Sequence, residues 1–180
     1  MIHPRAALLL ALLLARSAVA GPDEPPPDFT GTWKLDRNAS DPMHEMLKAQ
    51  GYSSVEVGIL AKLPVTQIMT QSPSGMEIAI RSTVIKTQEQ LRFDGVSYPD
   101  KSNVLGPLVR ASRWSPDGRY LLTVIRYSAK CGLSAEMTVS RTISSPERKQ
   151  MIQDTKVRLG DGREFKARQV FVRLDSGSKG

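Results

Sequence analysis

The sequence predicts a mainly β protein, a closed or nearly closed antiparallel up-and-down β-barrel of about ten strands. We expect a two-helix lid between the first and second strands. Three observations support this prediction: apolar and polar residues alternate along most of the chain, turn-forming residues separate the alternating runs, and one early interval has helical periodicity. The chain has 180 residues, 40% hydrophobic and 24% charged, which is typical of one globular domain.

Alternation with a period of two marks the strands, because successive side chains of a strand point to opposite faces of its sheet. It is clearest in four segments, which are residues 29–35, 76–80, 137–143 and 165–171. Turn-forming residues predict connections at 72–75, 94–95, 115–118 and 160–162. Many short strands joined by close turns are typical of an antiparallel barrel or sandwich.

One interval after the first predicted strand has the spacing of helices instead. Asp41-Pro42 suits the start of a first helix over 42–50, because Asp is a good N-cap and Pro a good first helical residue. Ser53 and Glu56 have the spacing of a capping box, which predicts a second helix over 54–62. The order of one strand, two helices and then strands only places the two helices between the first and second strands of the predicted barrel.

The ends of the chain have signals of their own. Residues 1–20 combine a positive residue, an apolar run and a small-x-small cleavage site at 18–20, as secretory signal peptides do. Residues 21–28 include four prolines and read as an extended tether. Residues 175–180 read as a disordered tail, which leaves 29–174 as the folded module. We therefore expect an exported protein, periplasmic or extracellular.

Several function classes lack the residues that they need. One Cys allows no disulfide within the chain, and one Cys with two His cannot build a cysteine/histidine zinc site. No nucleophile elbow, phosphate-binding loop or zinc-protease motif occurs, so we expect no enzyme, no metal and no cofactor. The basic residues behind the net charge of +7 are scattered, and 6% aromatic content does not favour nucleic-acid binding. We expect a monomer.

Six segments, taken in order, resemble elements of one known family; they are residues 29–37, 46–51, 58–64, 82–89, 117–127 and 169–171. They are similar to its opening strand, the end of its first helix, its second helix with the following proline, its third-to-fourth strand connection, a central hairpin and its closing strand. The family is that of the intracellular lipid-binding proteins, which bind fatty acids, retinoic acid and retinol. The export signal and a longer segment between Arg141 and Gln169 depart from the family, as a secreted bacterial relative would.

The resemblance implies a barrel with an interior cavity for one small lipophilic ligand, fatty-acid- or retinoid-like, in an exported carrier or sequestering protein. Lid and portal residues are then expected to contact the ligand: Met43, Met46, Leu47, Ile59 and Leu60 on the lid and Val84 on the opposite lip. Alternatively, the lid residues only pack against the barrel rim. Lys48 and Lys62 on the lid suggest transient contact with an anionic membrane surface.

Arg141 is the most informative polar residue, because it lies on the apolar face of its predicted strand. A buried guanidinium is costly unless it has an acidic partner, ordered water or a ligand carboxylate. The resemblance implies that Arg141 contacts the polar head of the ligand. Alternatively, Arg141 reaches the rim or pairs with Glu136 or Asp154.

The resemblance adds Gln169 as a second head-group residue, with Phe171 in place of the family's tyrosine, and we include Tyr127 among the expected contacts. One arginine and one amide predict broad affinity for lipophiles with one polar end and a mild preference for acids. The alternative function is an exported β-barrel that acts as a protein-interaction or inhibitor module and has a filled core.

Overall fold

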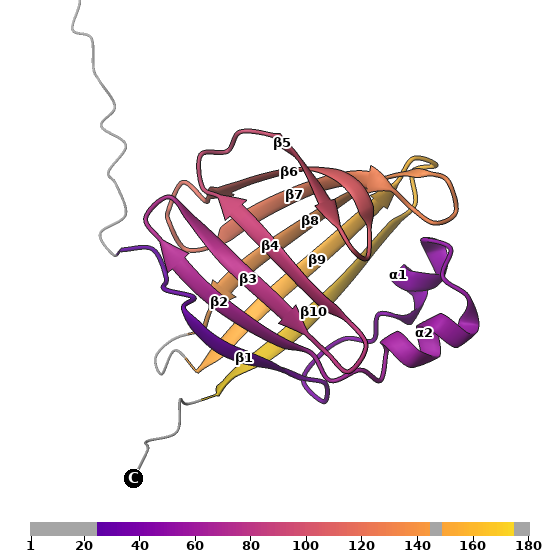
Figure 1. Ribbon diagram of the computed structural model, residues 1–180, viewed down its shortest axis with the longest axis horizontal. Coiled ribbons are helices and arrows are strands. Elements are labelled where there is room, and N and C mark those ends of the chain that lie inside the picture. The colour runs from indigo at the N-terminus through magenta and orange to yellow at the C-terminus, as the bar shows by residue number, and fades with distance from the viewer. Residues whose placement is uncertain (1–24, 145–148, 175–180) are drawn as a thin grey trace, which may run out of the picture.

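The computed structural model describes residues 25–144 and 149–174, which form ten strands and two short helices (Figure 1). The first strand, the helices and the next three strands are β1 (Gly31–Asp36), α1 (His44–Ala49), α2 (Ser54–Leu60), β2 (Thr66–Ser72), β3 (Gly75–Arg81) and β4 (Lys86–Arg92). The remaining strands are β5 (Tyr98–Ser102), β6 (Gly106–Trp114), β7 (Leu121–Ser128), β8 (Ser134–Ile143), β9 (Gln150–Leu159) and β10 (Glu164–Leu174). The predicted signal peptide (1–20) and tail (175–180) lie outside the described residues.

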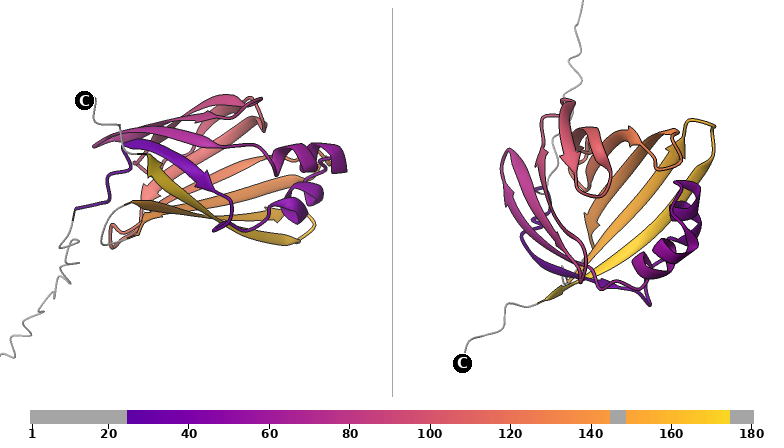
Figure 2. Two further views of the ribbon diagram at one scale, coloured as in Figure 1. Left: turned by 90° about the horizontal axis from the view of Figure 1, so that it is seen from below. Right: turned by 45° about the vertical axis from the view of Figure 1, so that its right-hand side comes forward.

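All ten strands belong to one antiparallel sheet in the order β4-β3-β2-β1-β10-β9-β8-β7-β6-β5, so that the first and last strands are neighbours. The sheet curls until its two edge strands, β4 and β5, face each other (Figure 2). Side chains bridge this gap: the Tyr98 hydroxyl on β5 donates a hydrogen bond to the Gln90 carbonyl oxygen on β4 at 2.5 Å. The predicted nearly closed up-and-down barrel is confirmed.

Each predicted turn connects two strands that follow one another in the chain. The turn at 115–118 is held by the Ser115 hydroxyl, which donates to the Asp117 carboxylate at 2.5 Å, and it contains Gly118 at φ +69°. Gly162, in the turn between β9 and β10, has φ +89°. Such positive φ angles favour glycine, which explains why these turn signals could be read from the sequence.

The predicted N-cap of the first helix is wrong. Helix α1 begins at His44 and has no side-chain cap, because the Asp41 carboxylate instead accepts the backbone N–H of Arg168 on β10 at 2.8 Å. The capping box of α2 is confirmed: Ser53 Oγ accepts the Glu56 N–H at 3.3 Å, and the Glu56 carboxylate accepts the Ser53 N–H at 2.8 Å. Helix α2 ends at Leu60, two residues before the predicted end.

Two apolar clusters lie at the two ends of the barrel. The end away from the helices holds Phe29, Trp33, Met69, Met76, Ile78, Leu91, Leu121, Met151 and Phe171. The end near the helices holds Met46, Leu108, Ile125, Tyr127, Ala129, Ala135, Val157, Leu159 and Ala167. Along β7 and β9 the inward positions between these clusters are polar, with Thr123 on β7 and Gln153 and Thr155 on β9. The barrel therefore has a polar layer between two apolar ones.

Candidate functional site

The polar layer, which we call the polar belt, is made by inward side chains of eight strands. Its members are Gln67 on β2, Glu89 on β4, Asp100 on β5, Arg110 and Ser112 on β6, Thr123 on β7, Arg141 on β8, Gln153 and Thr155 on β9, and Gln169 on β10. Strand register aligns them, because Arg141 is directly opposite Gln153, which is directly opposite Gln169. Side chains opposite each other in an antiparallel pair lie on the same face of the sheet.

Arg110 is the paired cation of the belt. Only 1% of its side chain is exposed, and its Nη1 contacts the Glu89 carboxylate at 2.7 Å while its Nε lies 3.2 Å from Asp100. Glu89 and Asp100 belong to the two edge strands, so this triad joins β4 to β5 through β6. Two carboxylates around one guanidinium satisfy its charge and help to close the barrel.

Arg141 is the unpaired cation of the belt. The residue is 5% exposed, and its Nε and Nη1 have no hydrogen-bond partner among the described residues. Burial lowers the pKa of Arg141 to about 10, while the charge of Glu89 opposes this shift and that of Arg110 adds to it. Buried polar groups are almost always satisfied, so such a guanidinium requires water or a ligand beside it.

The alternative partners expected for Arg141 pair elsewhere. Glu136 accepts from Arg126 at 2.9 Å, and Asp154 accepts from Arg168 at 2.8 Å. These pairs are exposed, whereas Arg141 points into the barrel and is buried. The inward orientation inferred from alternation is therefore confirmed, and the two internal pairings considered for this residue are wrong.

Three glutamine amides form a chain beside Arg141. Gln67 Nε2 donates to Gln153 Oε1 at 3.4 Å, and Gln153 Nε2 donates to Gln169 Oε1 at 3.0 Å. Within the described part of the protein, Gln67 Oε1 and Thr155 Oγ1 are buried and have no hydrogen-bond partner. Sequence reasoning found Gln169 but missed Gln67 and Gln153, although both occupy inward positions of alternating strands.

The other two predicted barrel residues lie on opposite sides of the belt. Phe171 is buried in the apolar cluster away from the helices, two residues beyond Gln169 on β10. Tyr127 is buried near the helices, where its hydroxyl donates to the Gln50 side-chain oxygen, and burial raises the pKa of Tyr127. Tyr127 thus connects β7 to the residue that follows α1 by a hydrogen bond, a role that the sequence did not suggest.

The structure separates the predicted lid residues by exposure. Met46 is buried in the cluster near the helices and Met43 packs against that cluster, while Leu47 and Leu60 are half-buried. Ile59 is 51% exposed on α2, and Val84 is 66% exposed in the turn between β3 and β4. Met46 and Met43 therefore reach the barrel interior, whereas Ile59 and Val84 lie on its outer surface. Ligand contact by any of the six remains a prediction.

The lid is also tied to the turn between β7 and β8. Lys130 Nζ lies 2.5 Å from the Glu56 carboxylate and 4.7 Å from the centre of the Tyr52 ring. The Cys131 N–H donates to the Gln50 carbonyl oxygen at 3.1 Å. Most of these contacts are polar and exposed, which suits a segment that must open.

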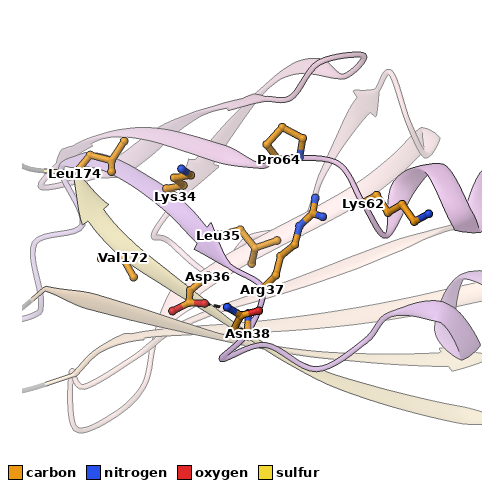
Figure 3. Close-up of a pocket in the computed structure, with 9 residues that line it drawn as sticks. All are labelled: Lys34, Leu35, Asp36, Arg37, Asn38, Lys62, Pro64, Val172 and Leu174. Carbon is orange, nitrogen blue, oxygen red and sulfur yellow. Dashed lines mark hydrogen bonds between the residues drawn. The ribbon is translucent and has the colours of Figure 1, made fainter.

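A groove of about 510 Å³ lies on the outer wall where β1 and β10 meet the connection from α2 to β2 (Figure 3). Its lining residues are Lys34, Leu35, Asp36, Arg37, Asn38, Lys62, Pro64, Val172 and Leu174. None of its three cations takes part in the ion pairs formed among the described residues. The groove thus combines apolar walls with positive charge, and it includes the predicted Lys62 but not Lys48.

Comparison with known proteins finds the same architecture in solved structures. The REP1-NXSQ fatty acid transporter superposes with a TM-score of 0.64 at 15% identity, covering 82% of this chain and 97% of that one. Apo lipid binding protein 8 of Caenorhabditis elegans gives a TM-score of 0.61 at 14% identity, with 81% and 95% covered. Human cRBP IV gives 0.61 at 16% identity, with 83% and 100% covered. No family model and no curated protein sequence matches the chain.

These likenesses define the class of fold. The chain has the ten-stranded barrel of the fatty-acid- and retinoid-binding proteins, with two helices between β1 and β2. The resemblance noted in the sequence is confirmed at the level of the fold. Within the described residues, no helix is long and apolar enough to cross a membrane.

Proposed function

We propose that this protein is an exported carrier or sequestering protein that binds one small lipophilic ligand inside its barrel. One observation carries the proposal: Arg141, buried at 5% exposure between two apolar clusters, has two guanidinium nitrogens without a hydrogen-bond partner among residues 25–144 and 149–174. A barrel of this kind offers its interior to an apolar ligand, and a ligand head group would satisfy those nitrogens.

The arrangement of the interior supports a defined ligand orientation. The polar end would lie in the belt at Arg141 and Gln169, and the apolar chain would run toward α1 past Met46. The ligand would then leave where α1 and α2 meet the barrel, and this requires the lid to loosen. The other proposed lid contacts (Met43, Leu47, Leu60) lie half-buried along that route.

Export is part of the same proposal and rests on the sequence of residues 1–20, with maturation expected before Gly21. The groove on the outer wall supports a further step, transient contact with anionic lipid during ligand transfer. Arg37 and Lys62 supply positive charge there, and Ile59 adds an exposed apolar side chain on α2.

The alternative, a protein-interaction or inhibitor module, predicts that no lipid accompanies the protein. Mass spectrometry of organic extracts of the mature protein, purified from its native host, distinguishes the two functions. The carrier predicts about one lipophile per chain, displaced by an added long-chain probe. Arg141→Leu, which cannot bind a polar head, should carry much less lipid than Arg119→Leu, since Arg119 is 84% exposed. An empty wild-type protein that binds no added lipophile would refute the carrier function.

A further inference from the structure

The charges of the polar belt cancel one another. Arg110 and Arg141 are the positive residues, and Glu89 and Asp100 are the negative ones. Arg110 contacts both carboxylates, and the charge of Glu89 also reaches Arg141, where it favours the protonated guanidinium. A belt with two cations and two anions has no net charge left for a ligand to neutralise.

A carboxylate ligand would therefore add a third negative charge to a balanced, buried layer. It would gain a bond to Arg141 but would also be repelled by Glu89, whose charge reaches Arg141, in a partly buried layer where like charges repel more strongly than in water. An uncharged head group forms the bond to Arg141 without this repulsion.

Both hydrogen-bond donors and hydrogen-bond acceptors of the belt lack partners among the described residues. Arg141 offers donors at Nε and Nη1, whereas Gln67 Oε1 is an acceptor that the amide chain leaves without a donor. The two lie on either side of Gln153, which is opposite Arg141 in the sheet and bonded to Gln67. A hydroxyl can accept from the guanidinium and donate to an acceptor, but an ionised carboxylate can only accept.

From this balance of charges and bonds we infer that the interior site, if it holds a ligand as proposed, selects an uncharged head group that both donates and accepts, as the hydroxyl of a long-chain alcohol does. Glu89 and Asp100 are the specificity-determining residues, because they cancel the charge that would otherwise attract an acid. This selectivity for uncharged head groups replaces the mild preference for acids that was expected from Arg141 and Gln169 in the sequence.

A matched pair of ligands tests the inference. The delipidated mature protein is titrated at pH 8 with cis-parinaric acid and with the corresponding alcohol, and their fluorescence is followed. We expect the alcohol to bind at least tenfold more tightly. Glu89→Gln and, separately, Asp100→Asn leave the belt with one net positive charge and should shift the ratio of affinities at least tenfold toward the acid. Glu77→Gln, on the exposed face of β3, should leave the ratio unchanged.

The outcomes separate this inference from the proposed function. Tighter binding of the acid by the wild type, or an equal ratio in Glu89→Gln, Asp100→Asn and Glu77→Gln, overturns the selectivity while the carrier function stands. Binding of neither ligand by the wild type removes the carrier function and the inference together. Near-ultraviolet circular dichroism, sensitive to the buried Trp33, identifies any variant that fails to fold.

Discussion

Arg141 and Arg110 are two guanidinium groups at similar depth in one barrel, yet their environments differ. Arg110 has two carboxylates within 3.2 Å, whereas two nitrogens of Arg141 have no hydrogen-bond partner in the described part of the chain. Moving a charged side chain from water into the protein interior costs several kcal/mol, and an ion pair recovers that cost only with good geometry and full hydrogen bonding. Arg110 recovers part of that cost through its ion pairs with Glu89 and Asp100, although its Nε makes no hydrogen bond within the described residues, whereas the ligand-free protein gains no such ion pair from Arg141.

This contrast predicts opposite effects on stability. Arg141→Met should raise the free energy of unfolding of the ligand-free protein by about 1–3 kcal/mol, because it removes a buried guanidinium that makes no ion pair within the described residues, while Glu89 and Asp100 both keep Arg110 as their partner. Arg110→Met should lower it by about 3–5 kcal/mol, since Glu89 and Asp100 lose their shared cation. Urea unfolding of both variants measures the difference. A lower free energy of unfolding in Arg141→Met would mean that Arg141 stabilises the folded protein.

Tyr127 allows a second test at a single residue. Tyr127→Phe removes the hydroxyl that donates to Gln50, and the buried oxygen of Gln50 then has no such partner, at a cost of about 1–3 kcal/mol. Because Gln50 follows α1, ligand release should also become faster, which stopped-flow transfer to vesicles measures. Tyr120→Phe is the matched control, because Tyr120 lies outside the lid and is 37% exposed. Equal rates of ligand release in the two variants would show that the hydrogen bond from Tyr127 to Gln50 does not hold the lid closed.

At the scale of elements, the helix pair is held by polar contacts at its linker and by Met46 inside the barrel. The hydrogen bond from Lys130, followed by those from Ser53, holds the pKa of Glu56 at about 2, below its usual 4.5. A carboxyl with a lowered pKa stabilises the folded state above its usual value, and this contribution disappears as the pH falls through about 2. The attachment of α2 to the turn between β7 and β8 is therefore acid-sensitive.

We expect ligand release to accelerate between pH 4.5 and 2 more strongly in the wild type than in Glu56→Gln. The variant lacks the carboxylate at every pH, so its release should already be fast at neutral pH and should change less on acidification. Release rates measured for both proteins across this range isolate the contribution of Glu56 from that of other acidic groups. Parallel pH profiles would show that this ion pair does not control the lid.

At the scale of the whole molecule, the outer groove brings positive side chains (Lys34, Arg37, Lys62) together with apolar ones (Leu35, Pro64, Val172, Leu174), as Figure 3 shows. Transfer of ligand to vesicles should therefore be faster with anionic than with neutral lipid, and salt should reduce the difference because it screens surface charge. Arg37→Glu should remove most of this preference, whereas Arg119→Glu, with the same change of charge on the turn between β6 and β7, should retain it. Equal rates of transfer to both kinds of vesicle at low salt would show that this surface does not contact anionic lipid during transfer.

Export is the other prediction for the whole molecule. Cleavage after the small-x-small site at 18–20 should yield a mature chain that begins at Gly21. Intact-mass analysis of the protein from its native host measures this directly. A chain that retains Met1 would contradict the prediction, whatever the ligand proves to be.

The sequence by itself determined the class of fold and the direction in which key side chains point. Alternation placed Arg141 and Gln169 inward, and Ser53 with Glu56 marked the start of α2, because these patterns depend on a few neighbouring residues. The start of α1 could not be read in this way. Asp41 is bonded to Arg168, 127 residues away, and local preference does not report such a partner.

Only the tertiary structure decided which polar residues meet. Gln67 and Gln153 are 86 residues apart in the chain and touch because the barrel closes through β1 and β10. Closure also brings Glu89 on β4 to Arg110 on β6, which already has Asp100 beside it on the neighbouring strand β5, and Arg141 has two guanidinium nitrogens without a hydrogen-bond partner among the described residues. Charge balance is a property of neighbours in space, which a pattern of period two does not contain. The barrel type could thus be read along the chain, whereas the selectivity of its interior depends on contacts that only folding makes.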